Sequence, residues 1–524
     1  MPAVSPSVTA SASSSTRRKP ICLTLVASPS GRPPAERALP KSPRISPRND
    51  LMENLAHSHP VDARAADDQA RYRPRLHFAP QRNWMNDPNG LVYFAGEYHL
   101  FYQYNPYGDQ WGHMSWGHAV SQDLVTWEEL AVAIPEQAGE MIFSGSIIVD
   151  WDNVSGLGVG GEPPLLAYYT GFDAVADIQR QCLAYSHDRG RTFSFYAGNP
   201  VIDLGMAHFR DPKVFWHAPS SAWVMVVALS REHKVQFYRS TNLLDWSLTG
   251  SFGPAGATSG QWECPDLMLV PLQNDPLQTR WVLKVDVDAA FVGGGSGAQY
   301  FVGKFDGFSF IVDRDSADGD TVDFGPDFYA AISWGELPSE QPGPLWIGWM
   351  SNHQTGRFYP TQPWRGAQSL PRTLFVFEEA GRWKLGQRPV ASAAKLFEAP
   401  QRGVVGDLTV ASGPTKGSFH ASVSLTVTEG ASETMVLVAG DEVLLSIRYE
   451  REPGLIFNRN DHGDIPEGSL TFETVTAYPT EGRIAIELFF DSCLVDIFVD
   501  GGKRVYSCCV FPEAPAFARV ALEQ

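Results

Sequence analysis

From about residue 72 to its end, the chain is a succession of short apolar or alternating runs separated by Gly, Pro and Asp clusters. Such runs are residues 98–103, 144–149, 165–170, 214–216, 223–229, 281–285 and 346–350. Their length and their flanking turn residues are those of β-strands, and helical periodicity is missing over any useful length. The pattern therefore predicts an all-β fold.

A weak internal repeat narrows the choice among all-β folds. Residues 121–127 (Ser-Gln-Asp-Leu-Val-Thr-Trp) resemble residues 240–246 (Ser-Thr-Asn-Leu-Leu-Asp-Trp), and residues 186–193 form a longer relative of both. Each copy follows a predicted strand, and the copies start roughly 55–65 residues apart, which suits one four-stranded blade per repeat. The repeat favours a β-propeller, with recurrent strand–turn chemistry as the alternative.

The character of the sequence changes after Pro371. Residues 71–374 are predicted to form the propeller, residues 375–415 a linker region, and residues 416–524 a β-sandwich. Within the last segment, two apolar runs flank residues 500–503 (Asp-Gly-Gly-Lys), which is a strong signal for a β-hairpin. A separate antiparallel domain of this length is a normal size.

Residues 1–70 are predicted to be a disordered or targeting extension. The first part is rich in Ser, Pro and Arg, with Glu36 and Asp50 as its only acids, so it lacks the material for a packed core. Residues 17–27 place a basic cluster before a short apolar run and resemble a weak twin-arginine export signal. A transit peptide and a translation start at Met52 are the alternatives. A cytoplasmic location is favoured, with secretion as the alternative.

Composition argues against several classes of function. A net charge of −18 argues against a nucleic-acid or other polyanionic partner, and no apolar run approaches the length of a membrane span. The six cysteines, apart from one vicinal pair, lie far apart and fit neither a disulfide framework nor a zinc site. His113 and His118 lack further ligands, which favours hydrogen-bonding roles. We therefore expect no metal and no cofactor; the sequence does not determine the oligomeric state.

Three acids stand in unusual surroundings. Asp87 lies within residues 83–90 (Asn-Trp-Met-Asn-Asp-Pro-Asn-Gly), Asp211 stands between an Arg and a Pro, and Glu263 is flanked by Trp and Cys. The octet is typical of a tight turn that opens a strand. Taken singly, each acid also fits a structural role. Together they suit glycosidic bond cleavage, which needs one carboxylate at the anomeric carbon and one acid at the leaving oxygen.

The neighbours of the three acids suggest different roles for them. Apolar neighbours and two nearby anions would raise the pKa of Glu263 and make it the general acid. Asp87, on a turn that Pro88 stiffens, is the better nucleophile. Asp211 is expected to stay ionised beside Arg210 and to stabilise positive charge. Because successive side chains of a regular strand face opposite ways, Arg210 and Asp211 can share a pocket only if the backbone is irregular there.

The three acids belong to an ordered series of motifs, through which the chain resembles glycoside hydrolase family 32, the family of invertases, exo-inulinases, levanases and fructan exohydrolases. The matching segments are residues 84–90, 143–146, 210–212, 263–265, 327–330, 349–352, 364–366, 371–372 and 495–501. The resemblance covers the chain from about residue 74 to its end. It implies a five-bladed β-propeller followed by a C-terminal β-sandwich.

The resemblance also implies a retaining β-fructofuranosidase that releases terminal fructose from sucrose and short fructans through a covalent fructosyl-enzyme. By position, Asp87 is the nucleophile, Glu263 the general acid and then the base, and Asp211 the transition-state stabiliser. Trp84 and Trp364 are implied as aromatic walls of the pocket, and Cys264 as a neighbour that tunes Glu263. The implied substrate-binding residues are Trp84, Asn86, Gln103, Trp111, Phe143, Ser144, Arg210, Cys264, Tyr329 and Trp364.

One region departs from part of the family. Where plant invertases carry an acidic acceptor-binding pair, residues 291–300 are Gly-rich, as in microbial sucrose and fructan hydrolases. Asp286 and Asp288 precede this segment and are candidates for contacting the leaving sugar, with a structural turn role as the alternative. The rival interpretations are a fructosyltransferase, a levan or inulin hydrolase with the same triad, and a catalytically silent sugar-binding protein.

Overall fold

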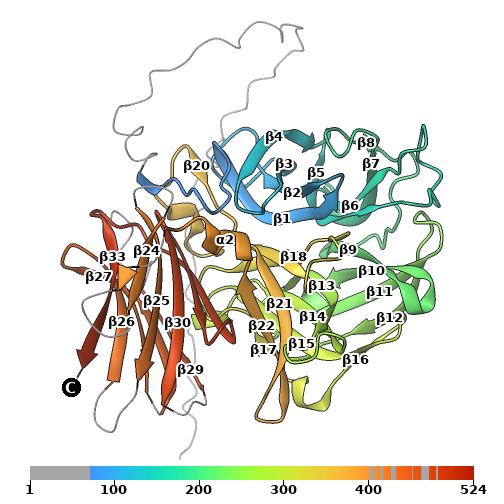
Figure 1. Ribbon diagram of the computed structural model, residues 1–524. Coiled ribbons are helices and arrows are strands. Elements are labelled where there is room, and N and C mark those ends of the chain that lie inside the picture. The colour runs from blue at the N-terminus through green and yellow to red at the C-terminus, as the bar shows by residue number, and fades with distance from the viewer. Residues whose placement is uncertain are drawn as a thin grey trace, which may run out of the picture. The chain divides into compact units, whose positions relative to one another are not determined.

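The computed structural model describes residues 71–398, 401–402, 408–413, 417–426, 432–450, 452–461, 471–478 and 482–523. The extension predicted for residues 1–70 lies outside these ranges. None of the helices within them is long and apolar enough to cross a membrane. The regular secondary structure of the described chain consists almost entirely of β-strands (Figure 1), so the all-β prediction is confirmed.

Five sheets follow one another between Asn83 and Pro389. Their strands are β1 (Asn83–Phe94), β2 (Glu97–Tyr104), β3 (Ser115–Ser121), β4 (Trp127–Ile134), β5 (Glu140–Val149), β6 (Leu165–Asp173), β7 (Ile178–Ser186), β8 (Ser194–Phe195), β9 (Phe209–His217), β10 (Ala222–Leu229), β11 (Lys234–Ser240), β12 (Ser247–Phe252), β13 (Trp262–Pro271), β14 (Thr279–Val287), β15 (Gly297–Phe305), β16 (Phe310–Val312), β17 (Asp320–Thr321), β18 (Tyr329–Ser333), β19 (Leu345–Trp349), β20 (Trp364–Arg365), β21 (Arg372–Glu379) and β22 (Arg382–Pro389). The short helices are η1 (Ala218–Ser220), η2 (Ser230–Glu232), η3 (Val292–Gly294), η4 (Arg314–Ser316), η5 (Gly356–Phe358) and α2 (Ala391–Lys395).

Pairing within these sheets follows the chain closely. The strand orders are β20-β1-β2-β3-β4, β5-β6-β7-β8, β12-β11-β10-β9, β13-β14-β15-β16 and β18-β19-β21-β22, with β17 paired to β15. The first strands of successive sheets also contact one another: β1 lies beside β5, β5 beside β9, β9 beside β13, β13 beside β18, and β18 beside β1. Residues on these five strands are therefore brought together although they are far apart in the sequence.

The repeated turn predicted from the sequence occupies the same position in three sheets. Ser121, Ser186 and Ser240 end strands β3, β7 and β11, which are the third strands of their sheets. Each serine hydroxyl accepts a backbone N–H from farther along the turn, at 2.8 or 2.9 Å. The Asp or Asn two residues later accepts another N–H. The repeat is therefore one structural device used at equivalent places.

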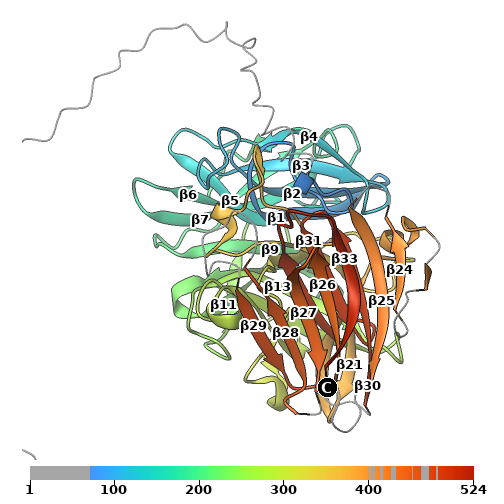
Figure 2. The ribbon, with the colours of Figure 1, turned by 90° about the vertical axis from the view of Figure 1, so that its left-hand side faces the viewer.

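The C-terminal region consists of two further sheets. Their strands are β23 (Gln401–Arg402), β24 (Thr409–Ser412), β25 (Ser418–Thr426), β26 (Ser432–Ala439), β27 (Glu442–Tyr449), β28 (Leu455–Arg459), β29 (Phe472–Thr476), β30 (Arg483–Asp491), β31 (Leu494–Val499), β32 (Arg504–Cys509) and β33 (Ala516–Glu523). The orders are β23-β24-β25-β30-β31-β32 and β29-β28-β27-β26-β33, the second of which is seen in Figure 2. Both sheets contribute to one apolar cluster. The predicted hairpin is confirmed as β31 and β32.

The predicted linker, residues 375–415, is wrong in its extent. Residues 375–389 form most of the β21–β22 hairpin, which belongs to the fifth sheet, and β24 already pairs with β25 of the C-terminal region. The charged tip of the hairpin interrupts the apolar pattern, which is why the sequence resembles a connection there. The hairpin is nevertheless largely buried, and Leu374, Val376 and Leu385 belong to one apolar cluster.

A buried charge network joins the fifth sheet to the C-terminal sheets. Arg372 on β21 donates to Asp323 at 2.9 Å and to Asp496 on β31 at 2.5 Å. His77 Nε2 lies 2.7 Å from Asp496 Oδ2, and its Nδ1 lies 3.1 Å from Asp491 Oδ2. Burial would lower the pKa of His77, but the hydrogen bonds to Asp491 and Asp496 raise it to about 9. His77 is therefore a buried cation at neutral pH.

Replacing His77 by Gln is expected to destabilise the protein more at about pH 6 than at about pH 9.5. A group whose pKa is raised on folding stabilises the native state fully below its unfolded pKa, and this contribution is lost as the pH rises through the folded pKa. The rise from 6.5 to about 9 corresponds to about 3 kcal/mol. Thermal melting of both proteins at the two pH values measures the difference. An equal drop in Tm at both would contradict the charged state of His77.

Candidate active site

One pocket, with a volume of about 590 Å³, gathers the three predicted acids. Its walls come mainly from strands β1, β5, β9 and β13 and from loops that connect strands within a sheet or between sheets. The lining residues are Trp84, Asn86, Asp87, Gln103, Gln110, Trp111, Phe143, Ser144, Phe172, Asp177, Gln179, His208, Arg210, Asp211, Gln261, Glu263, Trp349, Asn352, His353 and Arg357.

Asp87 lies inside β1, where this strand departs from regular pairing. The register between β1 and β2 shifts on both sides of Pro88 and Asn89, so the octet predicted to be a tight turn is instead an irregular stretch of strand. Gly90 has a φ of +55°, and a Cβ at this position would meet neighbouring side chains at 2.9 Å. The backbone irregularity therefore depends on a glycine directly after the Pro-Asn pair.

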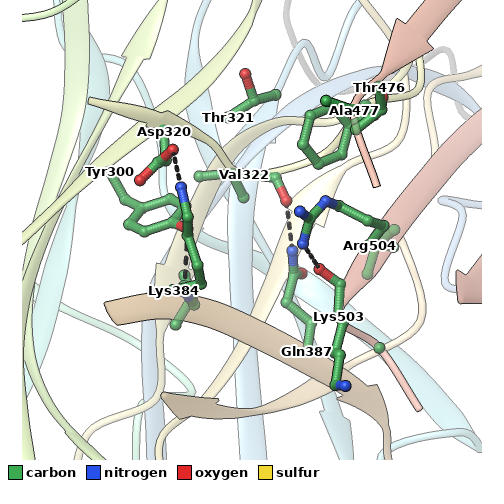
Figure 3. A pocket seen from close by; sticks show the side chains of 14 residues that line it. Tyr300, Asp320, Thr321, Val322, Lys384, Gln387, Thr476, Ala477, Lys503 and Arg504 are labelled. Carbon is green, nitrogen blue, oxygen red and sulfur yellow. Dashed lines mark hydrogen bonds and ion pairs between the residues drawn. The ribbon is translucent and has the colours of Figure 1, made fainter. Parts of the chain in front are cut away.

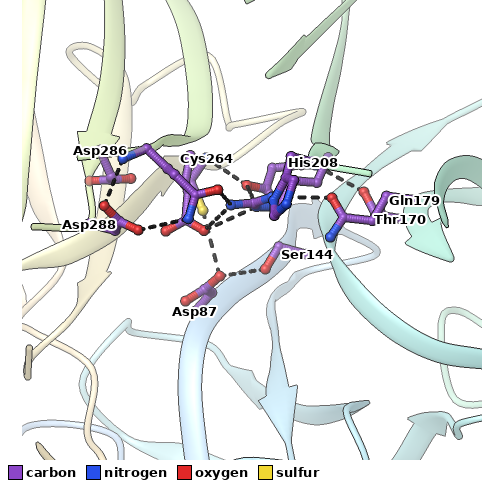
Figure 4. A network of polar contacts seen from close by, with 12 residues as sticks. Asp87, Ser144, Thr170, Gln179, His208, Cys264, Asp286 and Asp288 are labelled. Atoms are coloured by element: carbon purple, nitrogen blue, oxygen red, sulfur yellow. Dashed lines mark hydrogen bonds and ion pairs between the residues drawn. The ribbon is translucent and has the colours of Figure 1, made fainter. Parts of the chain in front are cut away.

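Neighbouring side chains contact both oxygens of the Asp87 carboxylate, and the contacts with Ser144 and Cys264 are seen in Figure 4. Its Oδ1 accepts from the Asn86 amide at 3.0 Å, and the Asn86 Oδ1 in turn accepts from the Trp84 indole at 2.8 Å. Its Oδ2 accepts from the Ser144 hydroxyl at 2.5 Å, and the Cys264 Sγ lies 3.6 Å from the same oxygen. These contacts fix the orientation of a half-buried carboxylate.

Asp211 has the irregular backbone that a shared pocket with Arg210 requires. Its φ is +66°, in the left-handed region, and the pairing of β9 with β10 shifts in register nearby. The Asp211 N–H donates to the Thr170 hydroxyl at 2.9 Å, and Asp211 Oδ2 accepts from the Cys264 N–H at 2.8 Å. The Arg210 Nε lies 3.9 Å from the same oxygen. Both side chains line the pocket, as this geometry allows.

Glu263 is bound through both of its carboxylate oxygens. Oε1 accepts from Arg210 Nε at 3.0 Å and from its Nη2 at 2.7 Å. Oε2 accepts from the Tyr329 hydroxyl at 2.5 Å and lies 3.9 Å from His353 Nε2. Arg210 thus connects two of the three acids but makes its short contacts only with Glu263.

The three acids differ in how the pocket shifts their pKa values. Burial and the charge of Glu263 raise the pKa of Asp87 above its usual value, although the Ser144 and Asn86 hydrogen bonds oppose this. Burial raises the pKa of Asp211 to about 7, against the opposing charge of Arg210. Burial also acts to raise the pKa of Glu263, but Arg210, His353 and the Tyr329 hydroxyl together lower it.

Two expectations about these acids are therefore wrong for the pocket without substrate. The raised pKa predicted for Glu263 is lowered instead, and Asp211, predicted to stay ionised, has a raised pKa. Burial raises the pKa of Asp211 against the opposing charge of Arg210, and the neighbouring carboxylates Glu263 and Asp87 add to this rise. At Glu263 the effect of burial on the pKa is outweighed, first of all by Arg210. The Arg210 guanidinium forms two short hydrogen bonds with Glu263 and stands farther from its sequence neighbour Asp211.

The other predicted residues divide into two groups. Seven of them line the pocket directly: Trp84, Asn86, Gln103, Trp111, Phe143, Ser144 and Arg210. Cys264 and Tyr329 are buried and do not line the pocket. Cys264 contacts Asp211 through its N–H and Asp87 through its Sγ, and the Tyr329 hydroxyl contacts Glu263. Both therefore act on the carboxylates without facing the open space.

Trp364 does not form an aromatic wall, so this prediction is wrong. Its side chain is buried in a separate cluster with Tyr72, Met350 and Tyr359, and the Arg73 guanidinium covers its ring at 4.7 Å. Strand β20 pairs in parallel with the start of β1, and this places Trp364 in the core while Trp84 faces the pocket. The motif of residues 364–366 is present, but tertiary packing sets the direction of the Trp364 ring.

Sequence reasoning missed ten lining residues. Trp349 and Asn352 lie within residues 349–352, one of the motifs quoted for the resemblance, and His353 follows this motif directly. Their position in or beside a motif could have identified these three as pocket residues. The others come from segments without a chemical motif: Gln110, Phe172, Asp177, Gln179, His208, Gln261 and Arg357. Their places depend on how successive sheets are arranged, which a local pattern does not reveal.

The two acids considered for the leaving sugar have structural roles. Asp286 is fully buried and forms an ion pair with Lys284, which also donates to the Cys264 carbonyl at 3.2 Å. Asp288 accepts the N–H of Gln261 at 2.7 Å and its side-chain amide at 3.1 Å. Neither acid lines the pocket, so contact with a leaving sugar is not supported.

The two predicted hydrogen-bonding histidines are confirmed in that role. His118 Nε2 lies 3.0 Å from His99 Nδ1 in the core, and burial lowers the pKa of both rings. His113 Nδ1 lies 2.8 Å from Glu136 Oε1 at the surface.

A second cavity, of about 190 Å³, lies between β17, β22 and the C-terminal strands (Figure 3). It carries charged side chains, but these bind one another or the backbone. Lys384 pairs with Asp320 at 2.5 Å, Gln387 donates to the Val322 carbonyl at 2.7 Å, and Arg504 donates to the Lys503 carbonyl at 2.8 Å. Since these polar groups already have partners, the pocket around the three acids is the better candidate for chemistry.

Comparison with known proteins finds similarity over most of the chain. Residues 77–389 match the model of the glycosyl hydrolases family 32 N-terminal domain, and residues 394–523 match that of the glycosyl hydrolases family 32 C terminal. The Bacillus subtilis levanase is 41% identical over 480 residues, which cover 88% of this chain and 70% of the levanase.

Solved structures show the same likeness. The exo-inulinase from Aspergillus awamori superposes with a TM-score of 0.78 at 35% identity, covering 86% of this chain and 95% of that one. The β-fructofuranosidase from Schwanniomyces occidentalis, complexed with fructosyl-erythritol, also gives a TM-score of 0.78, at 30% identity over 88% of this chain and 96% of that one.

Proposed function

Because this chain belongs to glycosyl hydrolase family 32, we propose that it is a retaining β-fructofuranosidase that releases terminal β-D-fructofuranosyl residues from sucrose and short fructans. The observation that carries the proposal is the gathering of Asp87, Asp211 and Glu263 in one pocket, with Arg210 and Tyr329 bound to Glu263. A pocket of about 590 Å³ also has the size of a small-molecule site.

In the proposed first step, an Asp87 oxygen bonds to the anomeric carbon of the fructosyl unit as the bond from that carbon to the leaving oxygen breaks. Glu263 gives its proton to the leaving oxygen, so glucose departs from sucrose as a neutral molecule. Asp211 binds fructose hydroxyls and stabilises the positive charge that develops on the ring. For this retaining chemistry we expect the two reacting carboxyl groups to stand about 5–5.5 Å apart.

In the second step, Glu263 takes a proton from water while the water oxygen attacks the anomeric carbon. The bond to Asp87 breaks, free fructose leaves, and both carboxyl groups return to their starting states. Two inversions at the same carbon give net retention. Sucrose and water therefore become glucose and fructose.

The mechanism requires Asp87 ionised and Glu263 protonated when substrate is bound. In the free pocket the raised pKa values of Asp87 and Asp211 keep a proton within the carboxylate cluster at mildly acidic pH. A leaving oxygen placed at Glu263 accepts a hydrogen bond from the protonated acid and so favours that form. Substrate binding is thus proposed to draw the shared proton to Glu263.

The proposal extends to the fold and its divisions. The ring of contacts through β1, β5, β9, β13 and β18 supports a five-bladed propeller whose innermost strands these are. The pocket with the three acids would lie in the central funnel of this propeller. The two C-terminal sheets around one apolar core support a β-sandwich. The boundary is proposed to lie between β22 and β23.

A second candidate, release of terminal fructose from levan or inulin, is favoured by the comparisons. A levanase and an exo-inulinase are among the proteins to which this chain is most similar over most of its length. Because the same triad would serve, this candidate changes only the leaving group.

The proposed function is tested by following glucose and fructose separately during incubation with concentrated sucrose, and fructose alone with levan and inulin. Equal release of the two sugars is expected, since water is the proposed acceptor. Glucose in clear excess would identify a fructosyltransferase instead. Absence of fructose release from all three substrates would contradict the proposal.

A further inference from the structure

His353 lies in the pocket, but the mechanism above gives it no role. Its side chain is 45% exposed, and its Nε2 stands 3.9 Å from Glu263 Oε2, the oxygen that also accepts from Tyr329. The imidazole meets the Tyr329 ring edge-on at 4.6 Å and the Trp349 ring edge-on at 5.7 Å between centroids. The ring is therefore held against two aromatic neighbours while one edge faces the pocket.

The segment that carries His353 is anchored firmly. The Asn352 carboxamide oxygen accepts the N–H of Gln354 at 2.9 Å and that of Thr355 at 2.8 Å, which closes a tight turn around His353. The Asn352 amide donates to the buried Asp327 at 2.5 Å, and Arg459 of the C-terminal sheets lies 2.6 Å from the same carboxylate. A side chain on such a turn has a defined position before substrate arrives.

The hydrogen-bonding capacity of the imidazole is available to a ligand. Among the residues that the structure describes, the ring has no hydrogen-bond partner, and its 3.9 Å approach to Glu263 is beyond hydrogen-bonding distance. An imidazole donates a hydrogen bond through at least one ring nitrogen in either protonation state. A sugar hydroxyl can accept such a bond, so the two groups are complementary.

The position of His353 relative to the acid decides which part of the substrate it meets. The oxygen that Glu263 protonates joins the fructosyl unit to the group that leaves, and the fructosyl unit itself must face Asp87. Resting on the proposed function, we infer that His353 determines leaving-group specificity by hydrogen bonding a hydroxyl of the expelled sugar next to the scissile oxygen. The ligand class is a polyhydroxylated leaving group, such as the glucose of sucrose or the next fructose of a fructan.

The test compares sucrose with methyl β-D-fructofuranoside, whose leaving group is methanol and carries no further hydroxyl. His353→Phe keeps an aromatic ring against Tyr329 and Trp349 but removes both nitrogens. Its kcat/KM for sucrose is expected to fall roughly 10-fold or more, while that for the methyl fructoside changes less than about 3-fold. His353→Gln, which can still donate and accept, is expected to recover most of the sucrose activity.

His187→Phe is the matched control, because His187 is an exposed histidine outside the pocket. Equal losses on the two substrates with His353→Phe, or an unchanged rate on sucrose, would overturn the inference. Failure of the proposed function itself is recognised separately, since the unmodified protein would then hydrolyse neither fructoside.

Discussion

An Asp87→Asn variant is expected to lose at least ~10⁴ in kcat/KM for sucrose while remaining folded. The amide has the same shape as the carboxylate but cannot form the bond to the anomeric carbon. It can still accept one hydrogen bond and donate another, so most contacts with Asn86, Ser144 and Cys264 have a substitute. The loss therefore reports the missing nucleophile, because the shape of the pocket is retained.

The same variant is expected to melt at an equal or higher temperature than the parent at neutral pH. Burial raises the pKa of Asp87, and an acid whose pKa is raised on folding destabilises the native state above its unfolded pKa. A neutral amide removes this penalty. A substitution that lowers activity but does not lower stability is characteristic of a residue kept for chemistry at the expense of stability.

The activity and the thermal stability of the variant are measured on one preparation, by initial rates on sucrose and by thermal melting. Asp203→Asn, at an exposed turn outside the pocket, controls for the exchange of a carboxylate for an amide. Activity close to that of the parent would refute the nucleophile role. A large drop in Tm would show that Asp87 is chiefly structural.

Local patterns were sufficient to predict much of the fold, because strand and turn preferences are set over a few residues. The hairpin β31–β32 and the turn that begins at Ser121, Ser186 and Ser240 were found where they were expected. The β21–β22 hairpin was missed because its charged tip resembles a linker, and only pairing with β19 makes it part of a sheet.

The site was predictable to the extent that its residues lie within motifs. Asp87, Asp211 and Glu263 line one pocket as expected. The direction of a side chain was not predictable in the same way: Trp364 turns into the core, and Arg210 turns to Glu263. Consequently the pKa order of the acids, which depends on distances of a few ångströms between different strands, was predicted with the wrong sign for two of them.

Glu263→Gln is expected to lower kcat/KM for sucrose by about 10²–10⁴, the usual contribution of general acid catalysis. The loss should depend on the leaving group. Glucose needs a proton as it departs, whereas p-nitrophenolate leaves without one. For p-nitrophenyl β-D-fructofuranoside we therefore expect formation of the fructosyl-enzyme to slow less than about 10-fold. Pre-steady-state release of p-nitrophenolate isolates this step from the later attack of water.

The pH profile supplies an independent test of the same role. In the parent, the rate of the first step falls as the pH rises, because Glu263 loses the proton that it must donate. In the free enzyme the Arg210 and His353 charges and the Tyr329 hydroxyl outweigh burial and lower the pKa of this acid, which places the fall toward acidic pH. Gln has no proton to lose, so the variant should show no such basic limb.

Glu128→Gln, at an exposed position outside the pocket, is the matched control and should retain both the rate and the basic limb. A uniform loss on sucrose and on the p-nitrophenyl substrate would contradict an acid role, since only a proton donor discriminates between leaving groups by their basicity. A basic limb that survives in Glu263→Gln would assign the titrating proton to another acid of the pocket, of which Asp211 has a pKa raised to about 7.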